Sequence, residues 1–497
     1  MHPLTGRWVE VNGGRGETLL TAMQRAGIQA DAQCGGNGTC GKCRVSLADG
    51  ETVLACRYRL SGPVKVLTGT AETGPPDPAG SFMTGLAFPK AGAASGAFDP
   101  DSAVSGGYAA AVDLGTTTLA ACLLAPVSGE VLLARSSRNP QCSYGADVIS
   151  RAQYSITHGP DELSRCIRGG VRELLKELSA GAGIRPDEIK AVSVAGNTCM
   201  HHLFLGLDVR KLARAPHVPA VKEALILKAE EYQLSVHPEA LLYMLPNIAG
   251  FVGGDTAACL ACLQPEREDA WTLLADIGTN SEMALAGKGK ITVCSAAAGP
   301  AFEGVGISCG MRAEEGAVAA VRNTDGGIET DVIGGGSARG ICGSGLLDLI
   351  AVLLERGDID EYGGLKCEDL LPVPLTQKDV RQFQLAKAAI AAGIECLLEK
   401  EGISAGDVSR VYLSGAFGNY LNPGSACAAG LFPEEFSGRI EQIGNASAAG
   451  AALILRSASA WEYAKEAAAK AEALELAELP EFQESFLNNI NFEVKTE

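Results

Sequence analysis

The sequence lacks the features of several protein classes. No apolar run reaches the 18 or so residues that a helix needs to cross a bilayer, and no signal peptide is evident at the N-terminus. Basic residues are fewer than acidic ones, 41 against 59, and the net charge of −18 argues against a nucleic-acid or anionic-membrane partner. A Walker A motif is also absent, which excludes a P-loop nucleotide site. We therefore expect a soluble cytoplasmic protein with neither kind of partner.

Most of the sixteen cysteines stand singly among apolar residues, which is typical of thiols in a reducing compartment rather than of a disulfide framework. Cys259 and Cys262 form one C-x2-C pair on an apolar helix, so core thiols are favoured over a metal site. We expect Cys199 to be a buried thiol as well, because no general base is placed beside it. The pair His201-His202 lies where a strand passes into a helix, and a capping or cleft role is favoured over metal binding.

The exception is a glycine-rich loop near the N-terminus that contains four cysteines within 23 residues. Its spacing, C-x5-C-x2-C-x12-C, is one residue longer in the first gap than the plant-type ferredoxin pattern. Glycines let the backbone wrap closely around a small group. A 2Fe-2S cluster is the favoured ligand, with zinc and plain thiols as alternatives, because structural zinc usually has two close cysteine pairs. The candidate ligands are Cys34, Cys40, Cys43 and Cys56.

Three regions follow from composition, and 46% hydrophobic residues are enough for several cores. Residues 1–70 are predicted to form a small β-grasp ferredoxin-like domain, with strands near 8–12, 43–48, 53–56 and 64–67 and a helix over 17–26. Residues 71–106 are rich in Gly, Ala and Pro and predict a flexible linker. Residues 107–497 are predicted to form an α/β domain.

Two similar segments of the α/β domain have the pattern strand, Asp-x-Gly-Thr, strand. Asp113 begins the first and Asp276 the second, and each is followed by a third strand. The N–H groups and hydroxyls of such a turn can bind phosphate, while the carboxylate holds Mg2+. A plain hairpin turn is the alternative for either segment alone. The candidate phosphate-binding residues are Gly115, Thr116, Thr117, Thr118, Gly278, Thr279 and Asn280.

This repetition indicates an internal duplication of the actin, sugar kinase and Hsp70-like (ASKHA) ATPase fold, with lobes at about 107–265 and 266–497 and ATP with Mg2+ as cofactors. In that fold a Gly-rich strand-to-helix turn receives adenosine, and Gly415, Gly418 and Asn419 fit it. Small residues around 251–258 and 340–348 fit the helices that join the lobes. Asp255 is expected either to contact Mg2+ or to cap a helix.

The whole pattern resembles the family of reductive activators of corrinoid-dependent enzymes (the RACE family). The resemblance rests on the cysteine loop with Leu54-Ala-Cys56 and on a series of motifs along nearly the whole chain. They are Asn139-Pro-Gln141, Tyr144 to Arg151, Val194 to His202, Pro246 to Gly250, Asp276 to Glu282, Ala298 to Gly304 and Gly415 to Gly418.

The resemblance implies ATP-dependent transfer of one electron to a corrinoid protein, which restores Co(I) from inactive Co(II) for a methyltransferase system. It also implies a low-potential electron donor of the ferredoxin or flavodoxin type. The loop after the second phosphate hairpin is expected to face the corrinoid through Ser295, Gly299, Pro300, Phe302 and Glu303. Near the C-terminus we expect a helix over 458–479 and a short closing strand.

Three other functions remain as alternatives. An ATP-driven activator of a 2-hydroxyacyl-CoA dehydratase or benzoyl-CoA reductase shares the ATPase fold but holds a 4Fe-4S cluster between subunits, and the four-cysteine head argues against it. A small-molecule kinase with a redox-sensing head would phosphorylate a substrate. A non-catalytic actin-like scaffold would hydrolyse ATP slowly, without any effect of a corrinoid.

Overall fold

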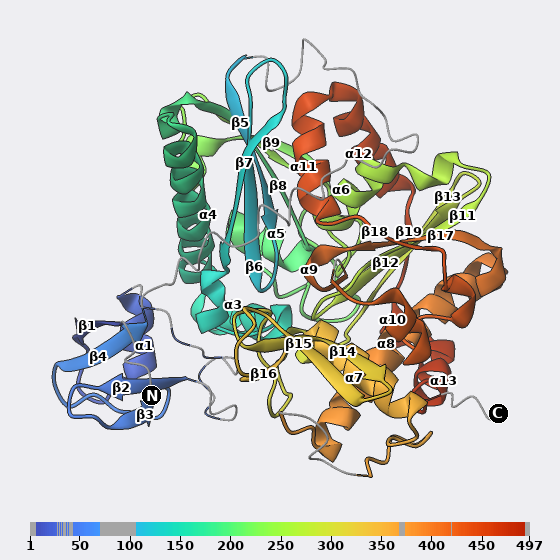
Figure 1. The fold of residues 1–497 in the computed structure, drawn as a ribbon. Coiled ribbons are helices and arrows are strands. Elements are labelled where there is room, and N and C mark those ends of the chain that lie inside the picture. The colour runs from blue at the N-terminus through green and yellow to red at the C-terminus, as the bar shows by residue number, and fades with distance from the viewer. Residues whose placement is uncertain are drawn as a thin grey trace. The chain divides into compact units, whose positions relative to one another are not determined.

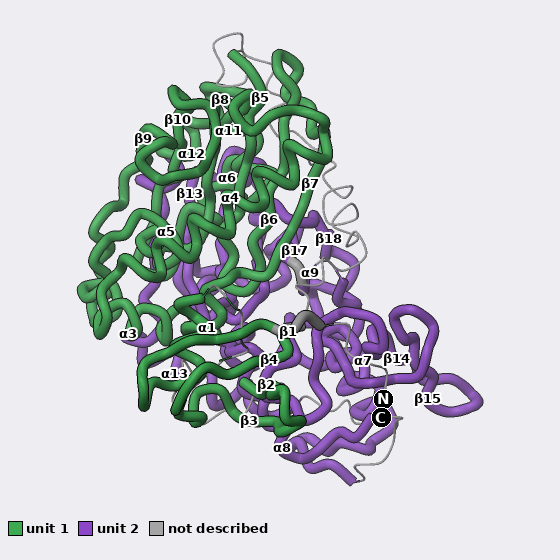
Figure 2. Tube along the Cα trace, turned by 90° about the vertical axis from the view of Figure 1, so that its left-hand side faces the viewer, with its two compact units in different colours: residues 1–84, 95–261, 447–465 green, residues 85–94, 262–446, 466–497 purple. Residues whose placement is uncertain are grey.

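The computed structural model describes residues 6–26, 28, 30, 32, 36, 38, 43–69, 106–366, 373–418 and 420–492. The expected linker, apart from Gly106, lies outside them. The described residues fall into two compact units (Figure 2). Unit 1 holds the part up to Ala261 together with Ser447–Lys465, and unit 2 holds Cys262–Ala446 and the chain from Glu466 onward.

The N-terminal part of unit 1 is a four-stranded sheet with one helix, as the sequence predicts (Figure 1). The strand order is β1-β4-β2-β3. Thr18 caps the helix through its hydroxyl, and Leu19, Leu20 and Met23 are buried against the sheet. The elements are β1 (Gly6–Val11), α1 (Leu19–Arg25), β2 (Arg44–Leu47), β3 (Thr52–Leu54) and β4 (Val64–Gly69).

The larger part of unit 1 is a six-stranded sheet in the order β7-β6-β5-β8-β10-β9. Its strands are β5 (Tyr108–Leu114), β6 (Thr118–Leu124), β7 (Val131–Arg138), β8 (Ile189–Gly196), β9 (Leu225–Lys228) and β10 (Leu241–Met244). Helix α4 packs on β6 and β7. The helices are α3 (Val148–His158), α4 (Asp161–Ala182), α5 (Thr198–Leu205), α6 (Gly254–Leu263), α11 (Ala446–Arg456) and α12 (Ala458–Lys470).

Unit 2 has a six-stranded sheet in the order β18-β17-β11-β12-β13-β19 and a small sheet in the order β15-β14-β16. The large sheet contains β11 (Trp271–Asp276), β12 (Ser281–Gly287), β13 (Lys290–Ala296), β17 (Val408–Ser414), β18 (Ile440–Gln442) and β19 (Glu472–Leu474). The small one contains β14 (Ala317–Thr324), β15 (Gly327–Val332) and β16 (Gly340–Ile341). The helices are α7 (Gly343–Glu355), α8 (Gln377–Glu401), α9 (Gly415–Gly418), α10 (Pro423–Ala428) and α13 (Pro480–Asn488).

The two large sheets have matching cores, which supports the internal duplication. In unit 1, β5, β6 and β7 are antiparallel neighbours, and β5 pairs in parallel with β8. In unit 2, β11, β12 and β13 repeat that arrangement, and β11 pairs in parallel with β17. Asp113 and Asp276 consequently stand near the same end of equivalent strands, where the carboxyl ends of parallel strands meet.

The two units divide the chain differently from the two expected lobes, whose predicted boundary lies at about residues 265 and 266. The first boundary falls at Cys262, and Ser447–Lys465 returns to unit 1. Long-range contacts explain the return, because Ser193 on β8 donates a 2.6 Å hydrogen bond to the carbonyl of Ala451 and Trp461 packs edge-on against Tyr243. Sequence patterns do not show such contacts between distant segments.

One expectation near the C-terminus is wrong. The expected helix over 458–479 ends at Lys470, because the chain then forms β19, which pairs in parallel with β13. A further helix, α13, packs on α8, and the expected closing strand falls on the last residues, of which 493–497 lie outside the described residues. Pro480 at the first helical position favours the start of α13. Within the described residues, no helix has the length and apolar character to cross a membrane.

Candidate functional site

Two of the four loop cysteines lie in the described part of the N-terminal ferredoxin-like domain (residues 1–70, the head), and they face each other. The Sγ atoms of Cys43 and Cys56 are 3.2 Å apart. The Cys43 side chain is buried, and the carbonyl of Cys43 accepts a 2.8 Å hydrogen bond from Ala55 N–H, which ties the two cysteine segments together. Cys34 and Cys40 lie outside the described residues.

Glycines in the same loop adopt backbone conformations that other residues avoid. Gly36 and Gly38 have φ values of +91° and +74°. A Cβ on Gly38 would stand 2.8 Å from Nε of Arg57, whose Nη2 donates a 2.6 Å hydrogen bond to the Gly38 carbonyl. Converging thiols in a left-handed glycine loop fit the donor set of a 2Fe-2S cluster.

Two asparagines form hydrogen bonds to the turn between β5 and β6, which is the first candidate phosphate hairpin. Asn139 is fully buried, and its Nδ2 donates a 2.8 Å hydrogen bond to the Gly115 carbonyl. Asn197, the N-cap of α5, donates from Nδ2 to Oγ1 of Thr116 at 3.1 Å. A Cβ on Gly115 would overlap the Thr118 carbonyl, so only glycine fits this turn. Gly115 to Thr118 therefore form a rigid tip on β5 and β6.

Asp113 lies on β5 directly before this tip. Its Oδ1 accepts a 2.9 Å hydrogen bond from the hydroxyl of Ser447, the second residue of α11. Gly253 lies close to the same hairpin support, since a Cβ there would stand 2.4 to 2.6 Å from backbone atoms of Asn197 and Thr198. Neighbouring Asp255 lies in the first turn of α6, and its Oδ1 accepts the Thr256 N–H at 2.7 Å. That contact supports the helix start and leaves magnesium binding by Asp255 a prediction.

The second aspartate, Asp276, shows the same close fit in unit 2. It ends β11, opposite Ser414 on β17 and Glu282 on β12. Gly415 follows with a φ of +84°, and a Cβ on it would overlap Oδ1 of Asp276. Glycine is therefore required at this position both for its backbone conformation and for space.

The expected adenosine turn begins at Gly415 and continues through α9. Gln442 on β18 fixes its far end by donating from Nε2 to the carbonyls of Gly418 and Leu421, at 2.9 and 2.8 Å. Asn419 lies outside the described residues.

The loop expected to face the corrinoid is tied to the second hairpin. Oε1 of Glu303 accepts hydrogen bonds from the N–H and the hydroxyl of Thr279, at 3.1 and 2.5 Å. The N–H of Gly299 donates to the Thr279 carbonyl at 3.0 Å. Ser295, on β13, donates from its hydroxyl to Oε1 of Glu282 at 3.3 Å.

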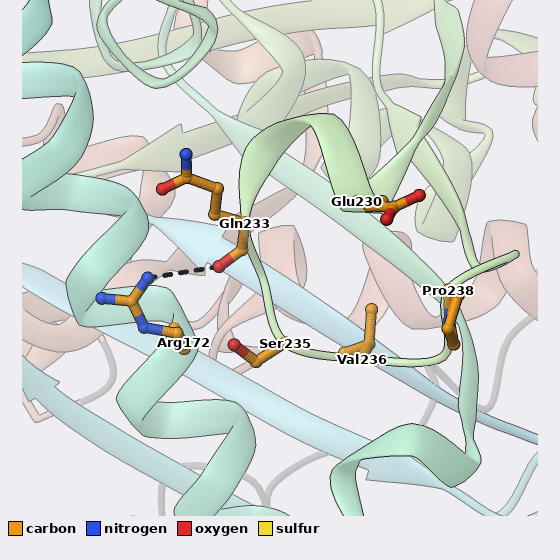
Figure 3. Close-up of a pocket in the computed structure, with 6 residues that line it drawn as sticks. All are labelled: Arg172, Glu230, Gln233, Ser235, Val236 and Pro238. Atoms are coloured by element: carbon orange, nitrogen blue, oxygen red, sulfur yellow. Dashed lines mark hydrogen bonds between the residues drawn. The ribbon is translucent and has the colours of Figure 1, made fainter.

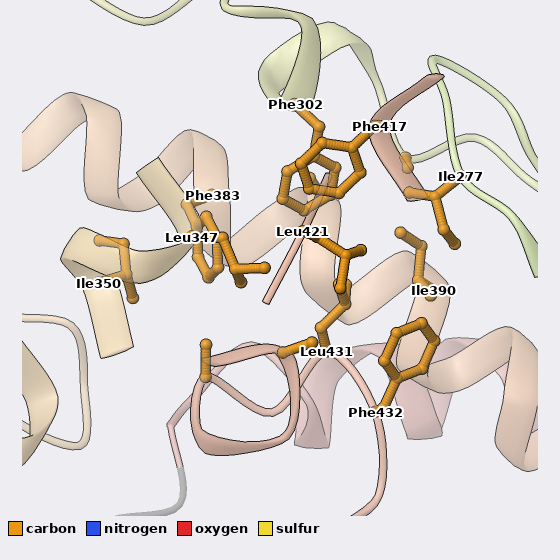
Figure 4. Close-up of a cluster of buried hydrophobic side chains, with 14 of the residues drawn as sticks. Ile277, Phe302, Leu347, Ile350, Phe383, Ile390, Phe417, Leu421, Leu431 and Phe432 are labelled. Carbon is orange, nitrogen blue, oxygen red and sulfur yellow. The ribbon is translucent and has the colours of Figure 1, made fainter. Parts of the chain in front are cut away.

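Phe302 corrects one expectation about this loop. It does not face outward, because its side chain is only 3% exposed and belongs to the main core of unit 2. Its ring stacks on that of Phe417, with centroids 4.6 Å apart and an interplanar angle of 18° (Figure 4). The sequence Gly-Pro-Ala-Phe-Glu-Gly predicts a loop, but residues Pro300–Glu303 form a 3-10 turn (η6) that points Phe302 inward.

Cys199, Cys259 and Cys262 are buried thiols, as expected, and His201 and His202 are buried on α5. Burial raises the pKa of the Cys199 and Cys262 thiols to about 12. Burial also lowers the pKa of His201 to about 3, and His202 accepts the Ala220 N–H on Nε2 at 2.9 Å. In the described part of the chain, no group of three or more His, Cys, Asp or Glu side chains is placed to hold a metal ion.

A separate hollow of about 260 Å3 lies on unit 1, and none of its lining residues is a predicted site residue (Figure 3). Arg172 donates from Nη1 to the Gln233 carbonyl at 3.3 Å across it. The lining residues are Arg172, Glu230, Gln233, Ser235, Val236 and Pro238.

Sequence reasoning missed the support of the hairpins. Ser447 is a serine in an Ala-rich helix, and no local pattern distinguishes it from a surface residue. Asn139 and Asn197 belong to the motifs that mark the family resemblance, but nothing in their spacing indicates that they bond the Gly115–Thr118 tip. The contact between Glu303 and Thr279 joins residues 24 positions apart and is equally hidden.

Comparisons with known proteins agree with this architecture. Residues 3–62 match the model of a 2Fe-2S iron-sulfur cluster binding domain, and residues 108–267 match that of the RACo middle region. The model described as the C-terminal domain of RACo, the ASKHA domain, matches residues 270–371 and 366–497.

Two curated relatives and one solved structure extend the match. The corrinoid activation enzyme RamQ of Eubacterium limosum is 34% identical over an alignment of 419 residues, and the match covers 78% of this chain and 70% of that one. The [Co(II) methylated amine-specific corrinoid protein] reductase of Methanosarcina barkeri is 30% identical over 380 residues, covering 69% of this chain and 68% of that one.

The solved structure is a reductive activator for a corrinoid, iron-sulfur protein. It is 29% identical, has a TM-score of 0.71, and is matched over 97% of this chain and 96% of its own. Together with the three domain matches, this likeness spans the head and both large sheets. The chain therefore belongs to the family of reductive activators of corrinoid proteins, with an N-terminal 2Fe-2S ferredoxin domain and an ASKHA ATPase domain.

Proposed function

We propose that this protein uses Mg-ATP to transfer one electron from a low-potential donor to the cobalt of a corrinoid protein. The electron reduces Co(II) to Co(I), the donor is oxidised by one electron, and ATP is hydrolysed to ADP and phosphate. The observation that supports this most strongly is that a 2Fe-2S domain and both RACo regions occur together in one chain. An electron carrier alone, or an ATPase alone, would need only one of these parts.

We assign the cluster to Cys34, Cys40, Cys43 and Cys56, of which the last two have converging thiols. When bound, a 2Fe-2S cluster supplies a one-electron carrier. The protein's own part is to hold the thiolates in a glycine loop and to cover one side of them, as the burial of Cys43 does. A ferredoxin or a flavodoxin is the donor class that fits, and the cytoplasm is the compartment that fits the reduced cysteines.

We assign Mg-ATP to the two hairpins and the adenosine turn. Asp113, Asp276 and Asp255 are the candidates for Mg2+, which prefers carboxylate and water oxygens. The two hairpin tips would supply N–H and hydroxyl donors to the phosphates. The asparagine contacts that hold Gly115 and Thr116 in place support this assignment for the first tip. The candidates are Gly115, Thr116, Thr117, Thr118, Gly278, Thr279 and Asn280 for phosphate and Gly415, Gly418 and Asn419 for adenosine.

We assign the corrinoid protein to the loop after β13, with Ser295, Gly299, Pro300 and Glu303 as the candidate contacts. A large uphill gap in potential would need either a ligand change at cobalt or breakdown of the complex, driven by ATP hydrolysis, that traps the product. A coupling of 1–3 kcal/mol, typical between two protein sites, shifts a one-electron potential by only about 45–130 mV. The loop is suitable because it bonds directly to the second hairpin through Thr279.

An anaerobic optical assay tests the proposal. The protein, a low-potential reductant and a candidate Co(II) corrinoid protein are mixed with and without Mg-ATP, and the Co(I) band is followed. We expect the band only with Mg-ATP, and its loss in Cys43→Ser and Asp276→Ala. ATP hydrolysis without any Co(I), for a panel of corrinoid proteins, would contradict the proposal and favour the kinase alternative.

A further inference from the structure

A carboxylate already occupies donors that the proposed function assigns to phosphate. Oε1 of Glu303 accepts from both the N–H and the hydroxyl of Thr279, at 3.1 and 2.5 Å. Thr279 lies at the tip between β11 and β12, two residues after Ile277 and immediately after Gly278. Two convergent donors on one residue bind a single anionic oxygen well.

The carboxylate and a phosphate oxygen cannot use these donors at the same time. An N–H provides one hydrogen and a hydroxyl one more, and Glu303 takes both. Two anions at the same place would also repel each other strongly in a partly buried environment. A phosphate that binds Thr279 must therefore displace Glu303.

Displacement of Glu303 would loosen a short segment, residues 299–304, which is also held by two other contacts. Glu303 is the last residue of η6 (Pro300–Glu303), and the preceding Phe302 stacks on Phe417 of α9 (Figure 4). Gly299, just before η6, donates its N–H to the Thr279 carbonyl at 3.0 Å. The segment thus contacts both the phosphate hairpin and the adenosine turn of unit 2.

We propose that Glu303 is a positioning residue that holds residues 299–304 against Thr279 until a phosphate of ATP replaces its carboxylate. Nucleotide binding then frees this segment, which couples the ATP site to the loop after β13. The inference rests on the proposed function in one respect, namely that Thr279 binds a phosphate of ATP. Because only the displaced state is competent to bind, the Glu303 contact weakens the apparent affinity for ATP.

Calorimetric titration of the full chain with the magnesium complex of β,γ-imido-ATP tests the competition. In Glu303→Gln the neutral amide is a weaker acceptor, so we expect binding about tenfold tighter than in the unsubstituted protein, which corresponds to ~1.4 kcal/mol. Glu314→Gln is the matched control, because it removes the same charge from an exposed residue of the following loop. Its affinity should equal that of the unsubstituted protein.

Amide hydrogen exchange tests the release of the segment. In the unsubstituted protein, the analogue should increase exchange in peptides covering 298–306, where the Gly299 N–H is now bonded. In Glu303→Gln, exchange there should be raised already without nucleotide and change little on its addition. These two results together support coupling and separate it from a purely structural role.

The experiments distinguish failure of the proposed function from failure of the proposed competition between Glu303 and phosphate. If the unsubstituted protein binds no nucleotide, both the proposed function and this inference are overturned. If it binds normally but Glu303→Gln has unchanged or weaker affinity, or exchange over 298–306 does not respond to the analogue, the inference alone is overturned. Weaker binding would indicate that Glu303 assists the nucleotide instead of competing with it.

Discussion

The hydroxyl of Ser447 donates a 2.9 Å hydrogen bond to Oδ1 of Asp113, across 334 positions of sequence. A helix from near the C-terminus thereby orients a candidate magnesium ligand on the first strand of the ATPase domain. Ser447 is 2% exposed, so water cannot easily replace its hydroxyl. Through this bond, α11 contributes to the candidate magnesium site that contains Asp113.

Replacing Ser447 tests that role. In Ser447→Ala, Asp113 loses this donor, and a hydrogen bond to a charged group contributes about 1.5–3 kcal/mol. We expect kcat/KM for ATP hydrolysis to fall by roughly tenfold or more. Ser459→Ala, which removes an exposed hydroxyl from the next helix, is the control and should keep its activity. Equal activity of the two variants would show that Asp113 does not need Ser447.

The contact between Gly415 and Asp276 gives a second prediction. Gly415→Ala adds a Cβ that overlaps Oδ1 of Asp276 at a φ of +84°. Gly402→Ala is a close control, because Gly402 has a φ of +67° and nothing within 4 Å of its Cβ position. Both should lose about 1–2 kcal/mol of stability from backbone strain in urea unfolding. Only Gly415→Ala should also lose ATPase activity, since Asp276 must move.

The cysteines give a third prediction, read out by iron content and visible absorption. Cys43→Ser should remove most of the iron and the cluster spectrum, because Cys43 is a candidate ligand whose Sγ lies 3.2 Å from that of Cys56. Cys262→Ser should retain both, although Cys262 also belongs to a C-x2-C pair, because it is buried in a helix with its pKa raised to about 12. Loss of iron in both variants would contradict the assignment.

Acid should destabilise the fold through His201. Burial lowers the pKa of His201 from its ordinary 6.5 to about 3 in the folded protein. Below pH 6.5, His201 is protonated in the unfolded chain but stays neutral in the folded protein. The free energy of unfolding therefore falls by about 1.4 kcal/mol for each pH unit of acidification. The loss should extend from about pH 6.5 towards pH 3. Urea unfolding between pH 7.5 and 5 measures the slope.

A His201→Met variant supplies the comparison for that slope. Met fills a similar volume and does not titrate, so the pH dependence should be smaller by about one proton. His202, whose pKa burial also lowers, is retained in both proteins. An unchanged slope would mean that other groups cause the acid sensitivity.

Much of the fold could be predicted because its signals are local. The segments around Asp113 and Asp276 each combine an apolar strand, a glycine turn and a second strand, and the structure confirms that their strands occupy equivalent places. The head's short strands and α1 follow similarly from alternation and a Thr18 cap.

The errors arose where distant segments decide the structure. The helix expected over 458–479 stops because β19 pairs with β13, far away in sequence. The position of its loop after the second hairpin predicts that Phe302 faces the corrinoid, but Phe417 and Phe383 pack against its ring. The roles of Ser447 and Glu303 depend on contacts that no local pattern encodes.

The return of Ser447–Lys465 to unit 1 has a consequence for biosynthesis. The ribosome synthesises the larger part of unit 2, Cys262–Ala446, before it makes the helices that contain the partners of Ser193 and Asp113. Until Lys465 has left the exit tunnel, the sheet of β5 to β10 lacks its contacts with residues 447–465. Unit 1 thus begins to form first and receives its last segment only after Cys262–Ala446 of unit 2 has been synthesised. A chain truncated before Ser447 would therefore impair unit 1, most of which is synthesised first, although the truncation removes residues near the C-terminus.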